Sequence, residues 1–238
     1  TLLLFPQFSC AGAADIESLA RAKAHHKNPG FTNPWLADER PGNFLRFLKW
    51  KFSANPFEEE KRERPAFRTI RPDVEKIREG GDSITYLGHG TLWLRLRGQN
   101  ILTDPIFGDA PFFIGLFAPF PLEPKDLPPF QVVLISHGHY DHLDADSIRL
   151  LGAGPLYLVP LGYRDWFEDV LPGAKVVELD WFESHTVDGV TCRFLPVQHW
   201  TKRTPFDTNR RLWGSWLVEA GNRKVFYAGD SGYFQGFA

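Results

Sequence analysis

The stretch Ser136-His137-Gly138-His139-Tyr140-Asp141-His142-Leu143-Asp144 directly follows the apolar run Val132–Ile135. The apolar run predicts a short buried strand, and the loop behind it carries three histidines and an aspartate within six residues. Imidazole nitrogens and carboxylate oxygens are the ligands that zinc and similar ions take, and a strand entering a tight loop directs alternate side chains to one point. The pattern His-x-His-x-Asp-His therefore predicts a metal site; the alternative is a solvated loop that is merely rich in histidine.

Two later residues extend this pattern. His199 stands in Pro196-Val197-Gln198-His199-Trp200 and Asp230 in Tyr227-Ala228-Gly229-Asp230-Ser231-Gly232, each at the end of an apolar, strand-like run. In residue type, order and spacing the chain resembles the metallo-β-lactamase superfamily. The resemblance implies that one divalent metal is held by His137, His139 and His199, that a second is held by Asp141 and His142, and that Asp230 bridges the two.

One ligand of the family pattern is absent. The family has a last histidine well downstream of the bridging aspartate, whereas this chain stops at Ala238, eight residues after Asp230. Without that histidine the second metal keeps only Asp141, His142 and Asp230 from protein. Thr1 is the first residue and the chain contains no methionine, so we expect a fragment truncated at its C-terminus rather than a degenerate site.

Segments around the ligands narrow the resemblance. From about residue 31 to the end, the chain is similar to the N-acylphosphatidylethanolamine-hydrolysing phospholipase D family and its bacterial relatives. The matching segments are Phe31-Thr32-Asn33-Pro34-Trp35, Tyr86-Leu87-Gly88-His89-Gly90-Thr91, Leu102-Thr103-Asp104-Pro105-Ile106-Phe107, His199-Trp200-Thr201-Lys202-Arg203-Thr204 and Leu212-Trp213-Gly214-Ser215-Trp216.

This resemblance implies an enzyme that hydrolyses a phospholipid head-group phosphodiester, releasing N-acylethanolamine and phosphatidic acid. Its cofactors would be two divalent metal ions, with zinc the first expectation, although a mixed His/Asp site also accepts iron or manganese. The metals would activate a bridging hydroxide that the catalytic carboxylates Asp141 and Asp230 orient. Two alternatives stay open: a lactonase or other small-substrate hydrolase of the same fold, and a metal-poor binding protein.

Supporting roles are predicted for several further residues. Asp104 ends a strand and is placed to accept the second ring N–H of a metal-bound histidine, or else only to form a turn before Pro105. His89 lies between glycines, in a pocket or in a surface turn. Either Lys202 or Arg203 is expected to face a phosphate.

The loop between residues 107 and 121 is rich in phenylalanine and interrupted by glycine and proline. We interpret Phe112, Phe113 and Phe117 as an acyl-chain wall or a segment that dips into a bilayer. Ordinary packing and a homodimer contact are the alternatives.

Composition sets the remaining limits. A chain of 238 residues with 43% hydrophobic residues can bury one large core. The formal net charge of -2 gives no electrostatic reason for nucleic acid as a partner. Cys10 and Cys192, the only two cysteines, do not make a disulfide framework.

The predicted fold class is α+β, the four-layer αββα sandwich that the resemblance implies, truncated at the C-terminus. Period-two patterning begins at Ser83, so we assign residues 1–80 to an N-terminal arm with short helices and 81–238 to an incomplete metallo-β-lactamase-like domain. Expected strands span 131–136, 155–159, 175–179, 182–187, 190–197, 212–219 and 223–229. Helices are expected at 15–25, 145–151 and 162–170.

The sequence of the arm is compatible with two cellular locations. Residues 1–14 are apolar and end in small residues, as in the remnant of an export signal, which would make the protein periplasmic; otherwise it is cytoplasmic. Phe44–Phe52 interleaves aromatic and basic residues, which suits either a helix on a membrane surface or a helix packed on the body. With a phospholipid substrate, we expect peripheral membrane association.

Overall fold

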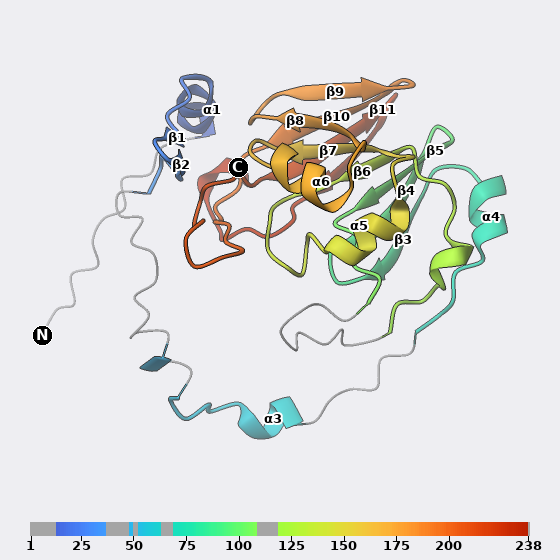
Figure 1. Ribbon diagram of the computed structural model, residues 1–238, viewed down its shortest axis with the longest axis horizontal. Helices are drawn as coiled ribbons and strands as arrows, with labels where there is room; N and C mark the ends of the chain where they lie inside the picture. Colours follow the sequence, from blue (N-terminus) through green and yellow to red (C-terminus); the bar gives the residue numbers. More distant parts are fainter. Residues whose placement is uncertain (1–12, 37–47, 50–51, 63–68, 109–118, 238) are drawn as a thin grey trace, which may run out of the picture.

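The computed structural model describes residues 13–36, 48–49, 52–62, 69–108 and 119–237. Two β-sheets face each other and form the body of the protein (Figure 1). The first sheet has six strands in the order β3-β4-β5-β6-β7-β8. Its strands are β3 (Ser83–Gly88), β4 (Thr91–Leu96), β5 (Gln99–Thr103), β6 (Val132–Leu134), β7 (Leu156–Pro160) and β8 (Lys175–Leu179).

The second sheet has four antiparallel strands in the order β12-β11-β10-β9. They are β9 (Ser184–Val187), β10 (Val190–Leu195), β11 (Ser215–Ala220) and β12 (Arg223–Tyr227). Along β10, the alternating residues Val190, Cys192 and Phe194 are buried. This period-two pattern gives the sheet one apolar face, which must be covered.

The main core lies between the two sheets. Leu94 and Leu134 of the first sheet pack in the same cluster as Phe194, Trp216 and Val218 of the second. All five side chains are fully buried. Each sheet thus covers the apolar face of the other.

Two helices cover the outer face of the six-stranded sheet: α5 (Ala145–Leu151) and α6 (Arg164–Val170). Ile148 of α5 and Phe167 of α6 pack on Val133 and Tyr157 of the sheet. The Asp144 side chain begins α5 by accepting a hydrogen bond from the Ser147 N–H. The predicted α+β sandwich is confirmed; the part of the chain that the structure describes supplies a helix–sheet–sheet order of layers.

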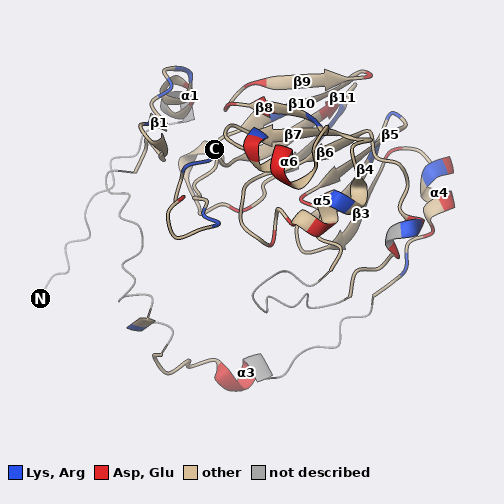
Figure 2. Ribbon diagram, in the orientation of Figure 1, with Lys and Arg blue, Asp and Glu red and all other residues tan. Residues whose placement is uncertain are grey.

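Charges of both signs occur on the surface helices. Each of α5, α6 and α4 (Val74–Glu79) carries both acidic and basic residues, and the acidic ones predominate on α6 (Figure 2). Arg149 pairs with Asp146 on α5, and Arg78 pairs with Glu75 on α4. These helices therefore present no surface of a single charge sign.

The arm contains short elements. They are α1 (Ala13–Arg21), the hairpin of β1 (His26–Lys27) and β2 (Gly30–Phe31), and α3 (Glu58–Arg62). The helix predicted over 15–25 is wrong at its C-terminus, because Lys23 adopts a positive φ of 56° and the chain turns into β1. The helix predicted over 44–52 lies largely outside the described residues. Among the described helices, none is both long and apolar enough to cross a lipid bilayer.

The strand predicted over 212–219 begins three residues late, at Ser215. The Leu212 N–H donates to the Leu161 carbonyl and the Gly214 N–H to the Ser136 carbonyl, both outside the second sheet. These backbone groups therefore tie β11 to the loops of the first sheet instead of extending the ladder. The strand predicted over 175–179 and the helix predicted over 145–151 have these ends in the structure, and the ends of the other predicted strands and of the helix over 162–170 differ by at most two residues.

Candidate metal centre

The candidate ligands converge because of the strand directions. β3, β5 and β6 run in the same direction, since β3 and β5 are each antiparallel to β4 and β5 is parallel to β6. β10 and β12 are likewise parallel to each other, since both are antiparallel to β11. The carboxyl ends of these five strands lead into the segments that carry the candidate ligands and their neighbours. These are His89, Asp104, the loop Ser136–Asp144 (the histidine loop), His199 and Asp230.

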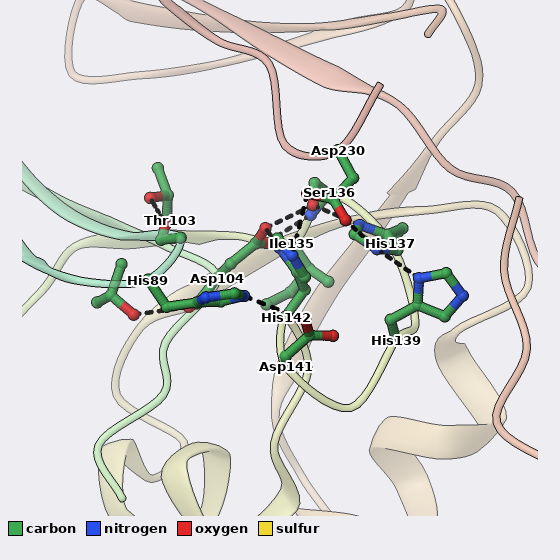
Figure 3. A network of polar contacts seen from close by, with 12 residues as sticks. His89, Thr103, Asp104, Ile135, Ser136, His137, His139, Asp141, His142 and Asp230 are labelled. Atoms are coloured by element: carbon green, nitrogen blue, oxygen red, sulfur yellow. Dashed lines mark hydrogen bonds and ion pairs between the residues drawn. The ribbon is translucent and has the colours of Figure 1, made fainter. Parts of the chain in front are cut away.

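The histidine loop is a tight turn directly behind β6. The N–H groups of His142 and Leu143 both donate to the His139 carbonyl. This turn brings His137, His139 and His142 onto the same side of the loop (Figure 3).

Three imidazoles form the first candidate ligand set. His139 Nδ1 lies 2.9 Å from His137 Nε2 and 3.2 Å from His199 Nε2. Ligand nitrogens of a tetrahedral zinc lie about 3.3 Å apart, because each bond is about 2.0–2.1 Å long. The spacing of the three nitrogens thus fits a single ion.

Asp230 lies between this set and His142. One carboxylate oxygen, Oδ1, lies 3.3 Å from His142 Nε2, and the other, Oδ2, lies 3.9 Å from His199 Nε2 and 4.0 Å from His137 Nε2. The Gly232 N–H donates to the Gln198 carbonyl at 2.8 Å and so joins the segment of Asp230 to that of His199. Asp230 therefore occupies the place of a bridging ligand.

The protonation states suit metal binding. Burial and the neighbouring imidazoles hold the pKa of His137 well below its ordinary value and lower the pKa of His199 to about 4. Both rings are therefore neutral near pH 7 and offer a lone pair. The nearby His142 imidazole, with its Nε2 3.3 Å from Asp230 Oδ1, lowers the pKa of Asp230 to about 2, so its carboxylate is ionised.

His142 differs from the other histidines. Burial lowers its pKa, but Asp104 and Asp230 outweigh that effect and raise the pKa to about 10. Its Nε2 is buried, has no hydrogen-bond partner among the described residues and is directed at Asp230. A cation bound there would take the place of the proton and satisfy this nitrogen. The residues present thus fit a divalent metal.

Asp104 is the centre of a buried network behind the ligands. Its Oδ2 accepts hydrogen bonds from His142 Nδ1 at 2.7 Å and from the Ser136 hydroxyl (Figure 3). The same oxygen accepts a hydrogen bond from the Tyr227 hydroxyl at 2.6 Å. Its Oδ1 accepts the Ser136 N–H at 2.7 Å. The structure therefore brings Asp104 to the second ring nitrogen of a candidate ligand, which fixes the tautomer that leaves Nε2 free for metal.

His89 lies at the solvent side of the centre. Its Nε2 is 3.2 Å from Asp141 Oδ2, and its ring packs edge-on against His142. The side chains of His89 and Asp141 are 37% and 25% exposed, so solvent reaches both. A Cβ on Gly90 would lie 2.7 Å from the Tyr227 hydroxyl, so only glycine fits beside His89.

Arg203 braces the histidine loop. Its Nη1 donates to the carbonyls of Gly138 at 2.9 Å and Leu143 at 2.8 Å, one near each end of the loop. The guanidinium carbon also lies 4.2 Å from the centre of the Tyr140 ring. Lys202, in contrast, is exposed. Of the two cations expected near a phosphate, Lys202 is the one that is accessible.

Replacing Arg203 by methionine should destabilise the metal-free protein by about 3 kcal/mol, because hydrogen bonds to charged groups contribute roughly 1.5–3 kcal/mol each. Urea denaturation of the metal-free protein measures this. Arg210→Met is the matched control, since Arg210 is exposed in the same segment. If Arg203 instead acts on substrate, Arg203→Met would leave stability unchanged and raise only KM.

The phenylalanines predicted as an acyl-chain wall, Phe112, Phe113 and Phe117, lie outside the described residues. At the described ends of their loop, the rings of Phe107 and Phe120 pack on each other with centroids 5.0 Å apart. Both are half-buried against the core under α5 and α6.

Sequence reasoning missed three contributors to the centre. Tyr227 donates to Asp104, Asn33 of the arm donates to the His199 carbonyl, and Trp200 packs edge-on against His139 with centroids 4.6 Å apart. All three stand in segments that carry the resemblance. That signal marked the segments without indicating which side chain reaches the ligands.

Two facing sheets, with histidines and aspartates gathered where several strands end, define a β-sandwich with a candidate metal centre. The profile of the beta-lactamase superfamily domain matches residues 99–237. The chain belongs to the beta-lactamase superfamily. The family and fold predicted from the sequence are thereby confirmed.

Individual proteins agree with this assignment. The N-acyl-phosphatidylethanolamine-hydrolyzing phospholipase D 1 of Caenorhabditis elegans is 36% identical over 171 residues, which cover 65% of this chain and 48% of that protein. An uncharacterized protein of Mycobacterium tuberculosis H37Rv is 31% identical over 242 residues, 95% of this chain and 63% of its own length. This chain therefore spans roughly half to two thirds of these relatives.

Among solved structures, a possible metal-dependent hydrolase from Veillonella parvula superposes with a TM-score of 0.54 at 19% identity. The superposition covers 66% of this chain and 65% of that one. At this identity the likeness supports the fold.

Proposed function

We propose that the protein is a metal-dependent hydrolase that cleaves the phosphodiester of N-acylphosphatidylethanolamine-type phospholipids, releasing N-acylethanolamine and phosphatidic acid. One observation carries the proposal: four imidazoles and two carboxylates converge in a chain that is 36% identical to a phospholipase D of this specificity. Superfamily membership supports the hydrolase class. The choice of an N-acylated phospholipid as substrate comes from that relative.

Two divalent metals in this centre, zinc by preference, would lower the pKa of a water toward neutrality and draw charge from the phosphoryl oxygens. The side chains of the protein have their own tasks. Asp230 and Asp141 orient the attacking water through their carboxylate oxygens. His89 and Asp141 form a hydrogen-bonded pair that solvent reaches. This pair accepts the proton that the attacking water loses.

Exposed aromatic side chains next to the ligands support a lipid substrate. Trp200 follows His199 directly and is 49% exposed, and Tyr233, three residues after Asp230, is 93% exposed. Phe206, in the same segment as Trp200, is 87% exposed. Amphipathic and aromatic rings of this kind suit the interface between a lipid surface and water. We therefore include peripheral membrane contact in the proposal.

The test is product analysis with the full-length, metal-loaded protein on N-acylphosphatidylethanolamine in mixed micelles. Equal amounts of N-acylethanolamine and phosphatidic acid, found by mass spectrometry and absent with His139→Ala, would support phospholipase D-type cleavage. Diacylglycerol as the product would show that the cleaved bond lies between the phosphate and the glycerol, on the other side of the phosphate. Turnover of lactones alone, in a parallel panel, would replace the lipid substrate by a lactone.

A further inference from the structure

Residues 13–36 of the arm are attached to the body by a buried carboxylate. Asp180, just behind β8, is only 2% exposed. It accepts hydrogen bonds from His25 Nε2 at 2.6 Å and His26 Nε2 at 2.8 Å, and it also pairs with the Lys23 ammonium. These cation and imidazole partners hold the pKa of Asp180 below its ordinary value. The arm supplies all three side chains, so this contact fixes it against the end of β8.

Stacked rings extend this attachment. His25 stacks on Trp181 with centroids 4.2 Å apart, and Trp35 stacks on Trp181 at 5.4 Å and on Phe234 at 4.9 Å. Phe234 belongs to the segment that follows Asp230. The arm thus joins the end of β8 to the segment of a candidate metal ligand.

The arm hairpin also touches the segment that carries His199. The Phe31 N–H donates to the Asn209 carbonyl at 2.8 Å, and a Cβ on Gly30 would lie 2.2 Å from that oxygen. Asn209 is in turn bonded to Thr201 twice, through its N–H and its side-chain oxygen. These two hydrogen bonds tie the end of the loop that follows His199 back to its beginning. The arm hairpin binds at Asn209, where the two ends of the loop meet.

One arm side chain reaches the ligand residue itself. Asn33 is 4% exposed, and its Nδ2 donates to the His199 carbonyl at 2.9 Å. We propose that Asn33 is a positioning residue for the metal ligand His199, so that the arm is a part of the metal centre. The hydrogen bond fixes the peptide plane behind His199 and so the direction in which its Nε2 points. The inference rests on the metal centre of the proposed function and not on the lipid substrate.

Asn33→Asp tests the inference, because aspartate has nearly the same shape but its ionised side chain cannot donate to a carbonyl. We expect about tenfold weaker Co²⁺ binding, at the lower end of the range for groups that support ligands. The visible absorption of the bound Co²⁺ should also change, since it reports ligand geometry. The matched control is Asn222→Asp, the same change in the exposed turn between β11 and β12.

A double-mutant cycle separates positioning from general stability. In a His199→Ala background, Asn33→Asp should cost no further Co²⁺ affinity, because the residue it positions is gone. The same tenfold loss in both backgrounds, or an unchanged affinity and spectrum for Asn33→Asp alone, would overturn the inference. If the wild-type protein binds Co²⁺ with His199 as a ligand but hydrolyses no lipid, the proposed substrate fails while this inference stands.

Discussion

Replacing His139 by alanine should weaken metal binding by more than about 100-fold, because even groups that only support a ligand are worth 10–100-fold. His139 Nδ1 lies between His137 Nε2 and His199 Nε2, at 2.9 and 3.2 Å. The substitution removes the ring nitrogen that lies close to both of the other imidazoles. Hydrolysis should fall with metal content, which elemental analysis after gel filtration measures alongside product release.

His185→Ala is the matched control for that experiment. His185 is a half-buried histidine of β9, in the second sheet, and belongs to none of the clusters that could hold a metal among the described residues. It should keep the wild-type metal content and activity. Full metal content in His139→Ala would show that the ions bind elsewhere, and the assignment of the first ligand set would then be wrong.

The candidate metal ligands could be selected from the sequence because their determinants are local. His137, His139, Asp141 and His142 share one loop, and the apolar run before it marks a buried strand whatever the rest of the chain does. His199 follows a strand of clear period-two pattern, and Asp230 follows an apolar, strand-like run. These strands lie in two different sheets, so the expectation that their carboxyl ends meet came from the family resemblance.

The supporting contacts depend on long-range packing and could not be read in this way. Nothing in the spacing shows that Arg203 is used on loop carbonyls instead of a phosphate, since either partner suits a guanidinium. Asn33 and His199 are 166 positions apart, and they meet because several contacts, among them those of Asp180, hold the arm against the body. The late start of β11 has the same origin, in a bond from Gly214 to Ser136.

Asp104→Asn should destabilise the protein by about 3–5 kcal/mol, the usual cost of breaking a buried charged network by changing one partner. Asp104 is fully buried and accepts from Ser136, His142 and Tyr227. An amide keeps the shape but turns an NH₂ group toward donors, so at least one of them loses its acceptor. Thermal denaturation without metal measures this loss.

The same substitution should also weaken metal binding by about 10–100-fold, because it frees the ring of His142 to take the wrong tautomer. Tyr227→Phe distinguishes the two effects. It removes one hydrogen bond to Asp104 and leaves the carboxylate on His142 Nδ1, so we expect a stability loss of about 1–2 kcal/mol with metal affinity nearly unchanged. Equal losses of metal affinity in both variants would mean that Asp104 acts only through the packing of the core and not on the histidine.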